Sequence, residues 1–144
     1  MNADPLVDVL ILAGGQGLRY REVSESTPKV LADLNGSTVL EILVNWLPVT
    51  INQVTLCLGH LADQVVAYVE KKKLVNHRFT SLNYTIEKSP LGTGGALIMA
   101  SRESKADWIV VLNGDTFFSG DALDLVQIVK SKIRENPRKR AWLA

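Results

Sequence analysis

The sequence predicts a single domain of the α/β class: a three-layer α/β/α sandwich around a mainly parallel, Rossmann-like sheet. The chain has 144 residues, of which 47% are apolar, so it is long enough to bury one substantial core. Short apolar runs alternate along it with stretches of helical periodicity. This alternation indicates parallel strands joined by right-handed crossovers, with helices on both faces of the sheet.

The strands are expected where branched apolar residues gather in short runs. The first run, Val7-Asp8-Val9-Leu10-Ile11-Leu12, is nearly continuous, as is typical of a strand buried on both faces of a parallel sheet. A similar run ends at Gly59-His60, and another contains Trp108. The expected strands cover residues 6–13, 53–58, 82–87 and 108–112, and a further strand begins at 141–144.

The helices are expected between these strands. Thr38 and Glu41 have the spacing of a capping box, which predicts a helix that begins near Thr38, runs to about Trp46 and ends at Pro48. Three lysines close the second helix, where the helix dipole favours cations. The remaining helices are expected over residues 62–73, 94–102 and 121–134.

Three glycines follow the first strand within four residues, at Gly14, Gly15 and Gly17. Glycine admits positive φ and leaves no Cβ to block a ligand, and consecutive free N–H groups in such a loop can hold an anion. Arg19 and Lys29 add two cations nearby. The stretch therefore indicates a polyphosphate site, although a tight turn after the strand explains the glycines on their own.

Two well-known phosphate-binding patterns do not match this loop. A dinucleotide-binding G-x-G-x-x-G beginning at Gly15 needs a small residue where Tyr20 stands. A Walker loop ends in Gly-Lys-Ser/Thr, whereas Gly17 is followed here by Leu18 and Arg19. An NAD-dependent Rossmann domain is accordingly disfavoured.

The candidate polar residues fall at the carboxyl ends of the expected strands. The glycine loop follows the first strand, residues 87–92 follow the third, and 113–115 follow the strand that contains Trp108. Ligands of open α/β sheets bind in the crevice at these ends. Asp115 is the kind of hard oxygen ligand that Mg²⁺ takes together with substrate phosphates, although an Asp after Asn-Gly also suits a simple turn.

Three segments in order resemble the sugar-1-phosphate nucleotidyltransferases. The first is Leu12-Ala13-Gly14-Gly15-Gln16-Gly17-Leu18-Arg19, followed by Pro28-Lys29. The others are Ser89-Pro90-Leu91-Gly92-Thr93-Gly94-Gly95-Ala96 and Leu112-Asn113-Gly114-Asp115. The second segment is most like that of the heptose- and mannose-1-phosphate guanylyltransferases. The resemblance spans nearly all of residues 1–144, as one domain that corresponds to the N-terminal, nucleotide-binding part of the family.

The resemblance implies transfer of a nucleoside monophosphate, GMP in the favoured case, from a triphosphate to a sugar 1-phosphate, with Mg²⁺ as cofactor. It assigns Arg19 and Lys29 to catalysis and Asp115 to the metal. It assigns the nucleotide to Ala13, Gly14, Gly15, Gly17, Glu87 and Gly92, with Glu87 facing the base. A carboxylate there can accept from N1 and N2 of guanine and suits uracil or thymine poorly.

Two departures from the family keep a second interpretation open. Leu18 and Tyr20 replace the usual Thr and Leu around Arg19, which removes a hydroxyl from the loop. Family members also continue well past 144 residues, and the part beyond normally supplies most of the sugar pocket and a second metal-binding Asp. The alternative is a catalytically inactive nucleotide-binding fragment or an interaction module.

Composition restricts the other partners. A net charge of +1 gives no reason to expect nucleic acid, and no run approaches the roughly 20 apolar residues of a membrane span. The N-terminus lacks the features of a signal peptide, so a cytoplasmic protein is expected. The single cysteine, Cys57, lies in an apolar run and is expected to be a buried thiol. Homo-oligomerisation is left open.

Overall fold

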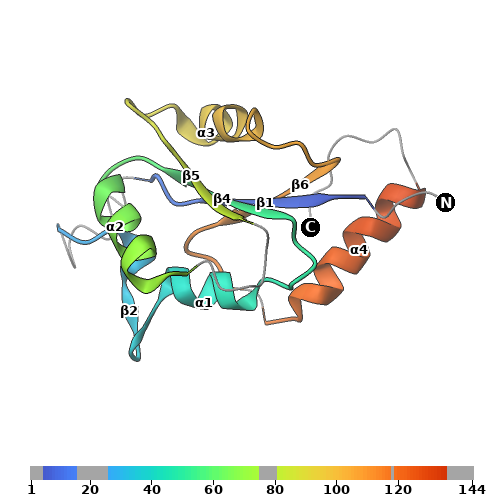
Figure 1. Ribbon diagram of the computed structural model, residues 1–144, viewed down its shortest axis with the longest axis horizontal. Helices are drawn as coiled ribbons and strands as arrows, with labels where there is room; N and C mark the ends of the chain where they lie inside the picture. The colour runs from blue at the N-terminus through green and yellow to red at the C-terminus, as the bar shows by residue number, and fades with distance from the viewer. Residues whose placement is uncertain (1–4, 16–25, 75–80, 118, 136–144) are drawn as a thin grey trace.

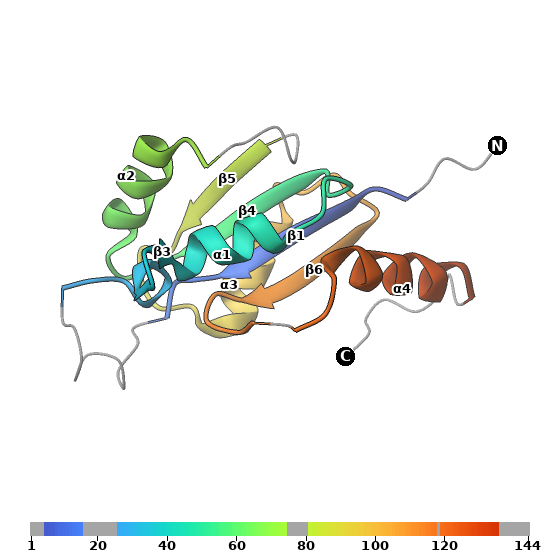
Figure 2. The ribbon, with the colours of Figure 1, turned by 90° about the horizontal axis from the view of Figure 1, so that it is seen from below.

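The computed structural model describes residues 5–15, 26–74, 81–117 and 119–135, and its centre is a four-stranded sheet. The strands are β1 (Val7–Leu12), β4 (Gln53–Leu58), β5 (Ser81–Ile86) and β6 (Trp108–Asn113). They lie in the order β5-β4-β1-β6, and every pair is parallel. The carboxyl ends of all four strands therefore lie at the same end of the sheet, as Figure 2 shows.

Helices cover both faces of this sheet, which confirms the three-layer sandwich. In Figure 1, α3 (Gly92–Ser101) lies alone on one side, and α1 (Val39–Trp46), α2 (Ala62–Lys72) and α4 (Ala122–Glu135) lie on the other. The larger core packs side chains of these three helices against one face of the strands. A smaller core joins Ala96 and Ala100 of α3 to Leu10 and Cys57.

Helix α1 begins with the predicted capping box. The Thr38 hydroxyl accepts from the Glu41 N–H at 3.2 Å, and the Glu41 carboxylate accepts from the Thr38 N–H at 2.9 Å. These two bonds satisfy donors that the first turn of a helix otherwise leaves unpaired. Glu41 also pairs with Lys72 of α2 at 3.2 Å, so one side chain both caps α1 and connects it to its neighbour.

A short element between β1 and α1 was not predicted. After the 3₁₀ turn η1 (Lys29–Leu31), strands β2 (Asp33–Leu34) and β3 (Ser37–Thr38) form a two-stranded hairpin. Its turn residues, Asn35 and Gly36, have φ of 57° and 90°. An Asn-Gly pair with positive φ at both positions is the usual sequence of a two-residue hairpin turn, so the signal was present.

The other predicted elements are found with small shifts at their ends. The strand and helix from 53 to 73 agree to within one residue, and α3 begins at Gly92 instead of residue 94. Cys57 is buried, as expected. The strand expected at 141–144 lies outside the described residues.

Candidate active site

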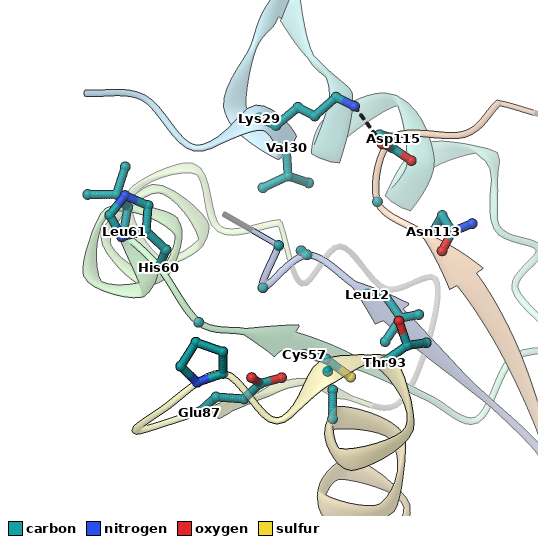
Figure 3. Close-up of a pocket in the computed structure, with 18 of the residues that line it drawn as sticks. Leu12, Lys29, Val30, Cys57, His60, Leu61, Glu87, Thr93, Asn113 and Asp115 are labelled. Atoms are coloured by element: carbon teal, nitrogen blue, oxygen red, sulfur yellow. Dashed lines mark hydrogen bonds and ion pairs between the residues drawn. The ribbon is translucent and has the colours of Figure 1, made fainter. Parts of the chain in front are cut away.

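A pocket of about 990 Å³ opens at the carboxyl ends of the strands (Figure 3). Its wall combines residues that follow each of the four strands with Lys29 of η1 and the first turn of α3. The chain folds this way because parallel strands must end at the same edge, so loops far apart in the sequence meet there. The single crevice that the sequence predicts is therefore present.

Most of the predicted site residues line this pocket. The structure places seven of them on its wall: Ala13, Gly14, Gly15, Lys29, Glu87, Gly92 and Asp115. Gly17 and Arg19 lie in the segment 16–25, outside the described residues. The glycine loop therefore contributes its first half to the described wall, directly after β1.

Lys29 and Asp115, 86 positions apart in sequence, form an ion pair at one side of the pocket. The Lys29 ammonium donates to the Asp115 carboxylate at 2.6 Å, and the two side chains are 47% and 44% exposed. This hydrogen bond lowers the pKa of Asp115 below its ordinary value, with a smaller contribution from the Thr116 hydroxyl. Figure 3 shows the pair across the end of β1 from Glu87.

The pair makes the titration of Asp115 depend on Lys29. We expect the pKa of Asp115, followed by NMR of its carboxyl carbon, to rise toward the ordinary carboxyl value in Lys29→Met. Because the folded-state pKa is the lowered one, the stability that this pair contributes is present above the ordinary carboxyl pKa. It is lost as the pH falls through the lowered value. An unchanged Asp115 pKa in Lys29→Met would contradict this.

Glu87 supports the segment that leads into α3. Its N–H donates to the Leu58 carbonyl at 2.9 Å, which continues the β4–β5 ladder past the end of β5. One carboxylate oxygen, Oε2, accepts from the Leu91 N–H at 2.9 Å. The side chain thus fixes the turn at residues 88–91 and also lies on the pocket wall. Gly92 follows this turn with φ of 69°, a conformation that favours glycine.

The residues around Asp115 fit a hard divalent cation. No group of three or more His, Cys, Asp or Glu side chains is gathered for a metal in the part of the chain that the structure describes. Mg²⁺ does not need such a cage, since it takes one or two carboxylates and fills its remaining positions with water and substrate phosphates. A carboxylate on the wall and a pocket beside it with room for phosphates meet these needs.

The structure adds pocket residues that sequence reasoning passed over. His60 is an exposed turn residue, and it lines the pocket with Gly59, directly after β4. The signal was available, because these residues end a parallel strand just as Gly14 and Asp115 do. Cys57 is also on the wall, and burial raises the pKa of its thiol to about 11, so it is neutral at pH 7.

The parallel sheet and the pocket at its strand ends define an α/β nucleotidyltransferase fold, which the structural relatives share. A family model described as "MobA-like NTP transferase domain" matches residues 9–136. The chain belongs to this family.

The relatives agree with this assignment. A D-glycero-alpha-D-manno-heptose 1-phosphate guanylyltransferase of Aneurinibacillus thermoaerophilus is 34% identical over 80% of this chain and 49% of its own length. One from Campylobacter jejuni is 34% identical over 88% of this chain and 55% of its own. HddC from Yersinia pseudotuberculosis, solved with GMP-PN, has a TM-score of 0.72 at 35% identity, over 84% of this chain and 53% of HddC. The chain thus spans about half the length of these relatives.

The helices that the structure describes include none long and apolar enough to cross a membrane.

Proposed function

We propose that residues 1–144 form the nucleotide-binding portion of a sugar-1-phosphate guanylyltransferase, which transfers GMP from GTP to a sugar 1-phosphate. The observation that carries the proposal is the composition of the pocket. Lys29 and Asp115 lie on one side of the end of β1, the carboxylate of Glu87 lies on the other, and the glycine loop follows β1 between them. This division matches a ligand with a polyanionic end and a flat, hydrogen-bonding end.

The reaction places simple demands on the protein. A phosphate oxygen of the sugar 1-phosphate attacks the α-phosphorus of GTP, the bond from that phosphorus to the bridging oxygen breaks, and pyrophosphate leaves. A phosphate monoester is already largely anionic at neutral pH, so no general base is required. The protein must hold two anions in line and neutralise their charge. We assign this work to Lys29 and Arg19 and to the N–H groups of the loop at Gly14, Gly15 and Gly17. Ala13 lines the nucleotide site, while its own N–H is held by the Cys57 carbonyl.

Asp115 is the residue that would hold a magnesium ion. When bound, Mg²⁺ supplies positive charge to the phosphate oxygens and lowers the repulsion between the two substrates. The carboxylate can serve this role once the Lys29 ammonium is taken by a phosphate, because the two groups are now paired with each other. A triphosphate and a cation together offer each member of the pair a new partner of opposite charge.

Guanine is the base that the wall favours. Glu87 can accept from the N1 and N2 hydrogens of guanine, and uracil and thymine lack this pair of adjacent donors. The similarity to HddC, whose structure contains GMP-PN, and to two heptose-1-phosphate guanylyltransferases supports the same base. The names of the two guanylyltransferases make a heptose 1-phosphate the favoured acceptor.

This specificity predicts the order of nucleotide affinities. GTP is expected to bind at least about tenfold more tightly than ATP, CTP, UTP or dTTP, since a polar group that the wrong base covers and leaves unpaired costs about 1–3 kcal/mol. In Glu87→Gln the advantage of GTP should shrink to a few-fold, because the amide still accepts from Leu91 but offers guanine a single acceptor atom. Calorimetric titration measures both. A preference for UTP or dTTP would contradict the assignment.

The proposed reaction is tested by pyrophosphate release with GTP, Mg²⁺ and a panel of sugar 1-phosphates, beside the Asp115→Asn variant. Release that requires both the sugar phosphate and Asp115 is the expected result for the enzyme. GTP binding without release would favour the second candidate, an inactive nucleotide-binding module. The absence of both GTP binding and pyrophosphate release would reject the proposal.

A further inference from the structure

Three of the strands that end at the pocket are followed closely by a glycine. Gly14 comes two residues after β1, and Gly59 and Gly114 come directly after β4 and β6. The parallel register places them beside one another, since Leu12 is opposite both Cys57 and Asn113. Backbone hydrogen bonds continue this pairing: Ala13 N–H donates to the Cys57 carbonyl at 2.9 Å, and Gly114 N–H to the Leu12 carbonyl at 2.8 Å.

No side chain fits at these positions. A Cβ on Gly59 would lie 2.8 Å from the Gly14 oxygen, and one on Gly14 would lie 3.0 Å from both the Gly59 nitrogen and the Leu58 carbonyl carbon. A Cβ on Gly114 would lie 2.8 Å from the Leu12 oxygen. Non-bonded carbon atoms prefer about 3.5–4.0 Å. The nearest atoms belong to the backbone, so relief requires the chain itself to move.

The atoms that would have to move belong to the start of the glycine loop. Gly59, which follows β4, lies beside Gly14, and Gly114, which follows β6, lies beside Leu12. The glycine loop therefore leaves the sheet between two strand ends that carry no side chain at these positions. N–H groups hold an anion well only when they point together at one place. A shift of the backbone at Leu12 or Gly14 therefore changes the direction in which the N–H groups at the start of the loop, those of Gly14 and Gly15, point.

We propose that Gly59 and Gly114 are positioning residues for the triphosphate. Because they have no side chains, the ends of β4 and β6 can pack closely against the glycine loop and hold its backbone in place. The proposal rests on the function proposed above, because it presumes that the loop binds phosphates. It assigns to Gly114 an effect on the phosphates and none on the base, which lies toward Glu87 on the other side of β1. Gly59 follows Leu58, whose carbonyl accepts from the Glu87 N–H, so a change there can reach the base as well. Neither glycine needs to contact the ligand for this.

The test compares Gly59→Ala and Gly114→Ala with a matched control, Gly120→Ala. Gly120 has no heavy atom within 4 Å of an added Cβ and lies away from the pocket wall. GTP affinity is expected to fall about tenfold in each of the first two variants, the effect of one lost charge-assisted hydrogen bond. Guanosine, which has no phosphates, should keep its affinity to within about twofold in Gly114→Ala. Calorimetry measures GTP binding, and NMR titration measures guanosine binding.

A second readout needs no ligand. The amide NMR signals of Gly14 and Gly15 should shift in both test variants of the free protein and stay in place in Gly120→Ala. If the unaltered chain does not bind GTP, the proposed function fails, and these signals still decide whether the two glycines set the loop. Equal losses of GTP and guanosine affinity in Gly114→Ala would overturn the inference. So would unmoved amide signals, or loss of the folded state in both test variants.

Discussion

Replacing Asp115 by Asn is expected to abolish the effect of Mg²⁺ on GTP binding and, in EDTA, to tighten GTP binding. The first effect follows because the proposed metal ligand is lost. The second follows because Lys29 is released: its ammonium is held 2.6 Å from the Asp115 carboxylate in the free protein, and a triphosphate must break this bond to use it. A half-exposed pair contributes up to about 1 kcal/mol, so the gain in EDTA should be about two- to fivefold.

Titration calorimetry with Mg²⁺ and with EDTA measures both effects. The unaltered chain should bind GTP about tenfold more tightly with the metal, and Asp115→Asn should show less than a twofold difference. Asp107→Asn is the matched control, since Asp107 lies at the other end of the sheet, where it accepts from the Leu6 N–H. A full response to Mg²⁺ in Asp115→Asn would rule out this residue as the metal ligand.

The Lys29→Met background separates release of the lysine from loss of charge repulsion. Without Lys29, the substitution Asp115→Asn removes only the repulsion between the carboxylate and the triphosphate. The gain in EDTA should therefore be smaller in Lys29→Met than in the chain that keeps Lys29. Equal gains in both backgrounds would mean that the ion pair does not compete with the nucleotide.

The sequence indicated the layers of the fold because its signals are local. The apolar runs at 7–12 and 53–58 identify buried strands, and Thr38 with Glu41 marks the start of α1. The start of α3 was predicted two residues too late. Glycine is a weak helix former, so the first turn, which contains Gly92 and Gly94, does not have a helical sequence pattern. The hairpin at 33–38 was missed although Asn35-Gly36 predicts its turn.

The sequence was enough to predict which residues line the site, but not which of them contact one another. The rule that parallel strands end together brought Gly14, Glu87 and Asp115 to one crevice. No local pattern predicts that Lys29 and Asp115 pair across 86 positions, or that a side chain at residue 59 would collide with Gly14. Both contacts depend on the strand order β5-β4-β1-β6, which the alternation of strands and helices does not specify.

Asp8 lies inside the first apolar run, and replacing it by Ala should cost the chain about 3 kcal/mol of unfolding free energy. The side chain is 1% exposed. Its two oxygens accept from the Asn52 amide at 2.8 Å and from the Ser104 hydroxyl at 2.6 Å. It thus joins β1 to the loops before β4 and before β6. Alanine leaves two partly buried donors, Asn52 and Ser104, without their acceptor, and each such group costs up to about 1–3 kcal/mol.

Urea unfolding followed by circular dichroism measures this loss. Asp107→Ala is the control, because Asp107 accepts one hydrogen bond at the same end of the sheet but is exposed, and its loss should cost less than about 1 kcal/mol. Asp8→Asn should fall between the two, because the amide keeps the shape of the carboxylate and can accept through one atom only. Asp8 lies at the opposite end of β1 from the pocket, so folded Asp8→Ala should still bind GTP. If Asp8→Ala were no less stable than Asp107→Ala, the buried carboxylate would not be holding the three segments together.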